Sequence, residues 1–176
     1  MINLISSLIP FGALLLLIAL GISLVTYLLS LISKPIRKHT EKLFDILQNF
    51  HTEIIFVLSF GSVIGSLFYS EVLHMAPCSL CWYGRITMYP IALISAVALY
   101  HNKRDARDYI LPLSLLGFII SAYHLAVQAK WIGSYLCSTE AATSCSDVQL
   151  MYYGFLTIPM MGIIVYTTII ALLAKK

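Results

Sequence analysis

The stretch Pro77-Cys78-Ser79-Leu80-Cys81-Trp82-Tyr83-Gly84-Arg85 joins a polar turn to an apolar run that ends at Tyr100. Because proline is common just before a helix, and because the following residues are apolar, we predict that a helix begins here. Cys81 then lies in the first helical turn, where unpaired N–H groups and the helix dipole favour an anion. Arg85 lies one turn further along the same face and adds a positive charge. Both effects favour the reactive thiolate form of a cysteine, so the stretch predicts a chemically active Cys-x-x-Cys pair.

The composition around this stretch is that of an integral membrane protein. The chain has 176 residues, of which 60% are hydrophobic and only 11% are charged, and its mean hydropathy is +0.89. A soluble domain has about a quarter of its residues charged. The apolar segments are long rather than short and alternating, which predicts helices and not the strands of a barrel. The sequence shows no basic stripe with interleaved aromatic residues, so nucleic-acid binding is not expected.

Five apolar segments are long enough to cross a hydrocarbon core of about 30 Å. The third must include Cys81, because residues 86–100 alone would make a helix of only about 22 Å. Arg85 is thereby drawn about one turn below the membrane surface, where an ionisable residue is costly and marks a candidate functional site. The alternative is that its side chain extends to the lipid head groups. The spans predicted for this all-α membrane protein are Gly12–Ser33, Ile54 to about Met75, Cys81–Tyr100, Tyr109–Ala129 and Tyr152–Ala174.

The segment between the first two spans has a different pattern. Residues 34–50 carry four basic residues, and apolar residues recur among them at helical spacing. This pattern fits a short amphipathic helix on the membrane surface, and a plain solvated connector fits it equally well.

The basic residues are unevenly distributed between the two sides of the membrane. Nine of the eleven lie in loops on one side, and only Arg85 and Lys130 lie on the other. The positive-inside rule places the larger group in the cytoplasm, which puts the C-terminus inside and the N-terminus outside. The four cysteines then fall on the extracytoplasmic side, where disulfides persist. They are Cys78, Cys81, Cys137 and Cys145.

One polar side chain of the fourth span, His124, is expected at a depth similar to that of Arg85. His124 is about one and a half turns below the outer surface, and Gln128 lies one turn above it on the same face. An arginine, a histidine, a glutamine and a thiolate can therefore converge in the outer leaflet. For His124 alone, an interhelical hydrogen bond is an equally good interpretation.

A reactive cysteine pair beside the lipid phase and a second pair on an external loop suggest an electron relay. Thiol–disulfide exchange passes two electrons from one pair to the other through mixed disulfides. The electrons then need an acceptor that dissolves in the bilayer, and a quinone, which takes up two electrons and two protons, suits that role. Arg85 can hydrogen-bond a quinone carbonyl and stabilise developing charge, and His124 can orient the ring or carry protons.

The segment from Cys78 to Arg85 resembles the Cys-x-x-Cys-x-x-x-Arg signature of the DsbB family of bacterial membrane disulfide oxidases. The segment Cys145-Ser-Asp-Val-Gln-Leu-Met-Tyr-Tyr-Gly-Phe-Leu-Thr-Ile-Pro159 is similar to the shorter, BdbC-type branch, as is Ser121-Ala-Tyr-His124. The resemblance implies a DsbB-type four-helix bundle with an additional N-terminal transmembrane helix. We therefore expect a disulfide oxidase domain at residues 51–176, and the additional helix with its cytoplasmic connector at residues 1–50.

The resemblance also implies an activity. It predicts a quinone-dependent thiol:disulfide oxidoreductase of the bacterial cytoplasmic (inner) membrane, which serves a secreted or periplasmic thioredoxin-like protein of DsbA type. That partner would attack the loop disulfide Cys137–Cys145 at Cys137, and Cys145 would then exchange with Cys78. Cys81 would pass the electrons to ubiquinone or menaquinone. The resemblance implies that Arg85 and His124 bind the quinone. We add Gln128 to the predicted quinone-binding residues, because it lies one turn from His124 on the same helix face.

Other interpretations are open at this point. Four cysteines can bind zinc as thiolates, although seven residues separate Cys137 from Cys145, more than the usual two to four. A vitamin-K-epoxide-reductase-like enzyme uses similar helices, cysteines and quinone chemistry, but that family places its Cys-x-x-Cys after the loop pair, and here it comes first. A scaffold or transporter, the third class, would not depend on Cys81.

Overall fold

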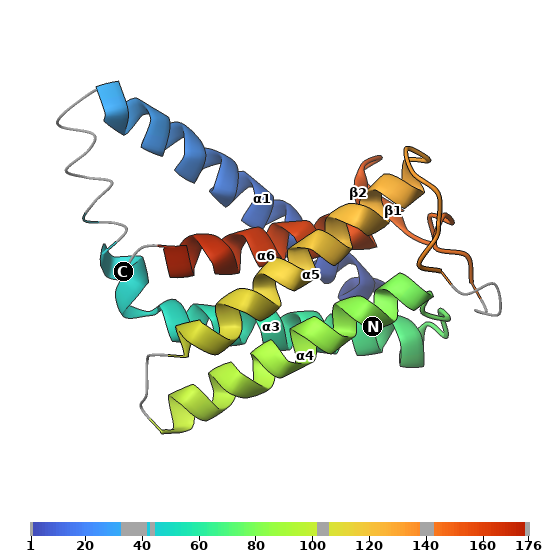
Figure 1. Ribbon diagram of the computed structural model, residues 1–176, viewed down its shortest axis with the longest axis horizontal. Helices are drawn as coiled ribbons and strands as arrows, with labels where there is room; N and C mark the ends of the chain where they lie inside the picture. Colours follow the sequence, from blue (N-terminus) through green and yellow to red (C-terminus); the bar gives the residue numbers. More distant parts are fainter. Residues whose placement is uncertain (1, 33–41, 43–44, 102–105, 138–142, 175–176) are drawn as a thin grey trace.

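The fold is described by a computed structural model, which covers residues 2–32, 42, 45–101, 106–137 and 143–174. It is mainly helical, with one short hairpin (Figure 1). The elements, in chain order, are α1 (Ile2–Ile32), α3 (His51–Leu67), the π-helix η1 (Phe68–Val72), α4 (Ser79–Tyr100), α5 (Arg107–Gln128), β1 (Met151–Tyr152), β2 (Leu156–Thr157) and α6 (Ile158–Ala174).

Helices α3 to α6 form the main bundle. α4 packs against both α3 and α5, and α6 packs against both α5 and α3, so the four helices make a closed ring. α1 contacts α6 and then runs away from the bundle at an angle (Figure 1). The segment between α5 and β1 lies at the end of the bundle where α4 begins.

The chain is a multi-pass membrane protein, as the sequence predicted. Among the described residues, four helical stretches are long and apolar enough to cross a membrane: Leu8–Thr26 within α1, His51–Val72, α4 and α5. α6 is apolar but has only 17 residues, the lower limit for crossing a core of about 30 Å. The predicted fold class, an all-α bundle with an additional N-terminal helix, is confirmed.

The core of the bundle combines branched apolar residues with small polar ones. Ile55, Ile91, Ile110 and Ile169 are almost completely buried where the helices meet. Buried serines donate hydrogen bonds to carbonyl oxygens four residues earlier in their own helices, which satisfies their hydroxyl groups and lets neighbouring helices approach closely. These serines are Ser59, Ser95 and Ser114.

The last helix begins later than predicted. We expected a helix from Tyr152, but β1 and β2 form an antiparallel hairpin in which Tyr152 pairs with Leu156. Gly154 has a φ of 78°, a conformation that glycine adopts without strain and that permits the turn. α6 starts only at Ile158. Hydropathy missed the turn because the segment is apolar throughout.

Other boundaries also differ in detail. α1 starts at Ile2, ten residues earlier than predicted, and accommodates Pro10 within the helix. The second span ends in a single π-helical turn at Val72, close to its predicted end. Residues 34–50, for which a surface helix and a plain connector fit equally well, lie largely outside the described residues. Within this segment, residues 42 and 45–49 are helical.

Candidate functional site

The Cys-x-x-Cys pair lies where α4 begins, as predicted. Cys78 precedes the first turn with an extended backbone (φ −72°, ψ 169°), and its Sγ accepts a hydrogen bond from the Cys81 backbone N–H at 3.3 Å. This is the geometry of a helix N-cap, in which a side chain satisfies one of the unpaired N–H groups of the first turn. The Sγ atoms of Cys78 and Cys81 are in contact, 2.6 Å apart, so both sulfurs sit at the positive end of the α4 dipole.

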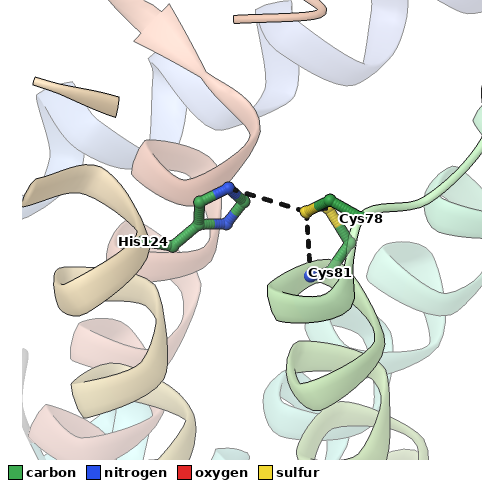
Figure 2. A group of neighbouring side chains, drawn as sticks. All are labelled: Cys78, Cys81 and His124. Carbon is green, nitrogen blue, oxygen red and sulfur yellow. Dashed lines mark hydrogen bonds between the residues drawn. The ribbon is translucent and has the colours of Figure 1, made fainter. Parts of the chain in front are cut away.

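His124 approaches the pair from α5 (Figure 2). Its Nε2 lies 3.7 Å from Cys78 Sγ, and both side chains are buried. Two segments that are 46 residues apart in the sequence therefore meet at the sulfur of Cys78. The structure brings His124 to the cysteine pair, which is the convergence that the shared depth suggested.

The groups around Cys78 favour its thiolate. The hydrogen bond from the Cys81 side chain is the largest influence, burial opposes it, and His124 lowers the pKa further, so the pKa of Cys78 lies well below that of an ordinary thiol. Sequence reasoning placed the anion-stabilising groups around Cys81. The structure gathers them around Cys78, because the N-cap side chain is the one that meets the free N–H groups.

Arg85 lies in the second turn of α4 and is held by α3. Its Nε donates to the Ser66 hydroxyl oxygen at 2.8 Å, and its Nη2 donates to the Ser66 carbonyl oxygen at 3.1 Å. Its guanidinium carbon lies 4.9 Å from the centre of the Trp82 ring, within the range of a cation–π contact. A guanidinium has five N–H donors, so these contacts fix its position and leave further donors for a ligand.

A cavity of about 770 Å³ opens beside the pair, and Cys81, Arg85 and His124 all lie on its wall. Its volume falls within the roughly 300–1,000 Å³ of typical small-molecule sites. Most of the remaining wall is apolar and comes from α1, α3, α4 and α6. The cavity is thus mainly apolar, with Cys81, Arg85 and His124 among its polar lining residues.

The loop cysteines are joined as a disulfide next to this site. The Cys137 and Cys145 sulfurs are bonded, and Cys145 is buried in one cluster with Cys78. Two hydrogen bonds join this loop to Ala76, which lies just before α4. Thr143 Oγ1 and Gln149 Nε2 both donate to the Ala76 carbonyl oxygen, at 3.1 Å and 3.0 Å. The two cysteine pairs are therefore neighbours, with Cys78 on the side of the loop.

Gln128 faces the loop rather than the large cavity. Its Nε2 donates to the Asp147 carbonyl oxygen at 3.4 Å. It borders a small recess shared with Cys78, Cys81 and His124, which is separate from the large cavity. Gln128 and Arg85, which we expected to converge, therefore lie on different sides of the cysteine pair.

Sequence reasoning did not single out Ser66, Thr87 or Tyr166. The Tyr166 hydroxyl on α6 is 2.6 Å from Thr87 Oγ1 and donates to the Gly84 carbonyl oxygen at 3.1 Å. It therefore ties α6 to the turn of α4 that carries Arg85. The sequence shows that Tyr166 places a hydroxyl group inside an apolar helix. It does not show which neighbouring helix that hydroxyl group contacts.

Three potential metal ligands also meet here. Cys78 Sγ, Cys81 Sγ and a ring nitrogen of His124 lie within 4.8 Å of one another. The other two cysteines form a disulfide, and zinc binds cysteine as a thiolate. In the described residues, the four-cysteine zinc site considered from the sequence is therefore not formed.

The chain is similar to known disulfide bond formation proteins. The sequence profile described as "Disulfide bond formation protein DsbB" matches residues 48–175. The SPbeta prophage-derived disulfide bond formation protein B of Bacillus subtilis is 38% identical over 116 residues, which cover 66% of this chain and 78% of the relative. The probable disulfide formation protein C 2 of Bacillus cereus is 34% identical over 128 residues, which cover 72% and 91%. Disulfide bond formation protein C of Bacillus subtilis is 34% identical over 114 residues, which cover 65% and 83%. No solved structure matches the chain significantly.

Proposed function

This chain belongs to the DsbB family of disulfide bond formation proteins, and from this premise we propose that it is a dithiol:quinone oxidoreductase. Membership of this family makes it a membrane thiol oxidoreductase. We add to this the donor and the acceptor of the electrons. The donor is an extracytoplasmic thioredoxin-like protein of DsbA type, and the acceptor is ubiquinone or menaquinone dissolved in the bilayer. The chain fits this role as a disulfide oxidase domain at residues 51–176 with an additional segment at residues 1–50.

The exchange begins at the loop disulfide. A thiolate of the partner attacks Cys137 Sγ, the Cys137–Cys145 bond breaks, and Cys145 leaves as a thiolate. The Cys145 thiolate attacks Cys78 Sγ of the oxidised inner pair, and Cys81 leaves as a thiolate. The second partner thiol then releases the oxidised partner from Cys137, and Cys137 attacks Cys145 to restore the loop disulfide. The inner pair is left carrying the two electrons.

The cavity beside Cys81 fits a quinone acceptor. Its apolar wall suits a lipid-soluble molecule, and Arg85 offers N–H donors of the kind that a quinone carbonyl accepts. A quinone, when bound, supplies a sink for two electrons and two protons. The role of Arg85 is to hold the carbonyl and to stabilise the negative charge that develops as Cys81 gives up electrons. His124, on the same wall, is placed to move a proton between Cys78 and the cavity.

One observation carries the proposal most strongly. The inner pair has Cys78 in a buried cluster with Cys145, whereas Cys81 lies on the wall of an apolar cavity with Arg85. Cys81 also packs against this cluster, but of the two cysteines only Cys81 lines the apolar cavity. This difference supports the assignment of Cys81 to the lipid-soluble acceptor and of Cys78 to the exchange with Cys145.

The proposed orientation puts both cysteine pairs on the extracytoplasmic side and the C-terminus in the cytoplasm. The basis is the distribution of basic residues in the sequence, nine against two. A membrane-impermeant thiol reagent, applied to intact cells after reduction, should label Cys137. If Cys137 were labelled only after the cells are opened, the protein would have the opposite orientation in the membrane.

Stopped-flow mixing tests the reaction itself. Purified protein is mixed with a quinone and a reduced thioredoxin-like protein, and the absorbance of the quinone is followed. We expect wild-type protein to reduce the quinone, Arg85→Ala to raise the KM for quinone, and Cys81→Ser to abolish the reaction. An unchanged rate in Cys81→Ser would rule out the proposed electron path.

A further inference from the structure

The N-terminal helix α1 contributes a continuous strip of side chains to the cavity wall. The strip follows one face of the helix over about three turns, with the spacing expected of a helical stripe. It lies outside residues 48–175, the part of the chain that matches the family. The residues of this strip are Leu8, Ile9, Gly12, Ala13, Leu15, Leu16 and Ala19.

Among the described side chains of α1, those nearest to Pro10 attach the helix to the bundle. Ile9 packs over Gly65 of α3, with side-chain atoms 3.6 Å from the position that a Cβ on Gly65 would occupy. Pro10 is buried. The other side chains described in α1, from Leu8 to Thr26, are partly or fully exposed, and the helix leaves the bundle beyond the cavity (Figure 1). Among the described side chains of α1, the one that is fully buried, Pro10, therefore lies in the part of the helix that borders the cavity.

We propose that α1 is a wall of the quinone site, and that the apolar tail of the quinone lies against the α1 strip. The inference rests on the proposed function, because it assigns a second contact surface to the same acceptor. Cys81 and Arg85 mark the part of the cavity that meets the polar ring. The α1 strip is apolar throughout, so it offers a matching surface to an isoprenoid chain and not to the ring.

Gly12 is the position on α1 that keeps this space open. It lies on the cavity wall, and a Cβ built on it would meet no atom within 4 Å. A larger side chain at this position would thus point into unfilled space without displacing protein atoms. Gly21 lies on the same helix and also has no atom within 4 Å of a built Cβ, but it does not line the cavity. The two glycines form a matched pair for a test.

The test compares Gly12→Leu with Gly21→Leu in the full chain. We expect Gly12→Leu to raise the KM for a quinone with several isoprene units by about tenfold, because its side chain occupies the space of the tail. The KM for a quinone without a tail should change much less. Gly21→Leu should behave as wild type. Oxidation of a reduced partner in a single turnover without quinone should be equal in all three proteins, because neither glycine contacts the four cysteines that exchange.

The outcomes separate this inference from the proposed function. If wild-type protein does not reduce quinone, the proposed function itself fails. If wild type is active and Gly12→Leu has the same KM as Gly21→Leu for the long-tailed quinone, α1 is not a wall of the site. A photoreactive quinone with the reactive group on its tail gives a second measurement on the unmodified chain. We expect its label on peptides from residues 8–19, and label on α3 and α6 without any on α1 would overturn the inference.

Discussion

Cys78 and Cys81 are three positions apart, yet their surroundings differ. Cys78 caps α4, accepts the Cys81 N–H and contacts His124. Cys81 lies in the first turn of the helix, on the wall of the cavity. The sequence predicted that a helix would begin at this pair. It did not predict which sulfur would receive the hydrogen bonds, because that depends on where the N-cap falls and on a histidine from another helix.

The first prediction concerns the ionisation of Cys78. In a reduced Cys137→Ser/Cys145→Ser protein, only the inner pair can titrate as thiols. Because the pKa of Cys78 is lowered, its proton leaves at a lower pH than that of an ordinary thiol, whose pKa is roughly 8.5. The ultraviolet absorbance of the thiolate should therefore persist at neutral pH and disappear only in acid. Adding His124→Ala should move this transition to higher pH, and a first transition near the ordinary value in the parent protein would contradict the assignment.

The second prediction concerns the support of Arg85. Ser66→Ala removes the hydroxyl that accepts from Nε but leaves the carbonyl that accepts from Nη2. A hydrogen bond to a charged group contributes about 1.5–3 kcal/mol, so the looser guanidinium should raise the KM for quinone about tenfold. Ser62→Ala is the control, because Ser62 lines the same cavity but donates only to Leu58 of its own helix. Equal kinetics in the two variants would show that Ser66 does not position Arg85.

At the scale of the elements, Tyr166 sets how closely α5 and α6 approach α4. Its hydroxyl bonds to Gly84 and Thr87 on α4, and its ring lies directly over Gly117 of α5, where a Cβ would overlap it. Gly117 is therefore a position at which one methyl group cannot be added without moving the ring. This contact fixes the turn of α4 that carries the cavity-lining residues.

A third prediction follows for the stability of the bundle. Gly117→Ala should lower the free energy of unfolding by about 1–3 kcal/mol, because the new methyl group overpacks against the Tyr166 ring. Gly61→Ala is the matched control. A Cβ there meets nothing within 4 Å, and alanine is the better helix former by up to about 1 kcal/mol. Thermal unfolding in detergent should rank Gly117→Ala below wild type and Gly61→Ala at or above it, and the reverse order would contradict the packing described here.

The long helices of the fold were predictable from hydropathy, whereas the short elements were not. The second, third and fourth spans lie close to where the sequence placed them, because a largely apolar run of about 20 residues has few alternatives to a membrane helix. The hairpin before α6 was missed, since Gly154 turns the chain inside an apolar run. The four-residue spacing between Cys81 and Arg85 was visible in the sequence, but the anchoring of Arg85 on Ser66 joins two helices and has no local signal.

At the scale of the whole molecule, the start of α4 and the segment between α5 and β1 lie at the same end of the bundle (Figure 1). The cysteines of these two segments meet in one buried cluster. The sequence indicated this grouping, because alternating spans carry both pairs to the same side. It gave no indication that α1 would pack beside the cavity, since an apolar membrane helix has no pattern that identifies its neighbours. The large cavity is likewise a product of five helices packing together, and no single segment encodes it.

The most direct test of the electron path is the ratio of the two products in the absence of oxygen. The protein is mixed with a limiting amount of a reduced thioredoxin-like partner and with excess quinone, and both the partner disulfide and the quinol are counted. Each partner dithiol gives up two electrons, and each quinone takes up two. We expect one quinol for each partner disulfide formed, with neither product in Cys81→Ser beyond a single turnover. Continued oxidation of the partner without quinol, or catalytic quinol formation in Cys81→Ser, would contradict this electron path.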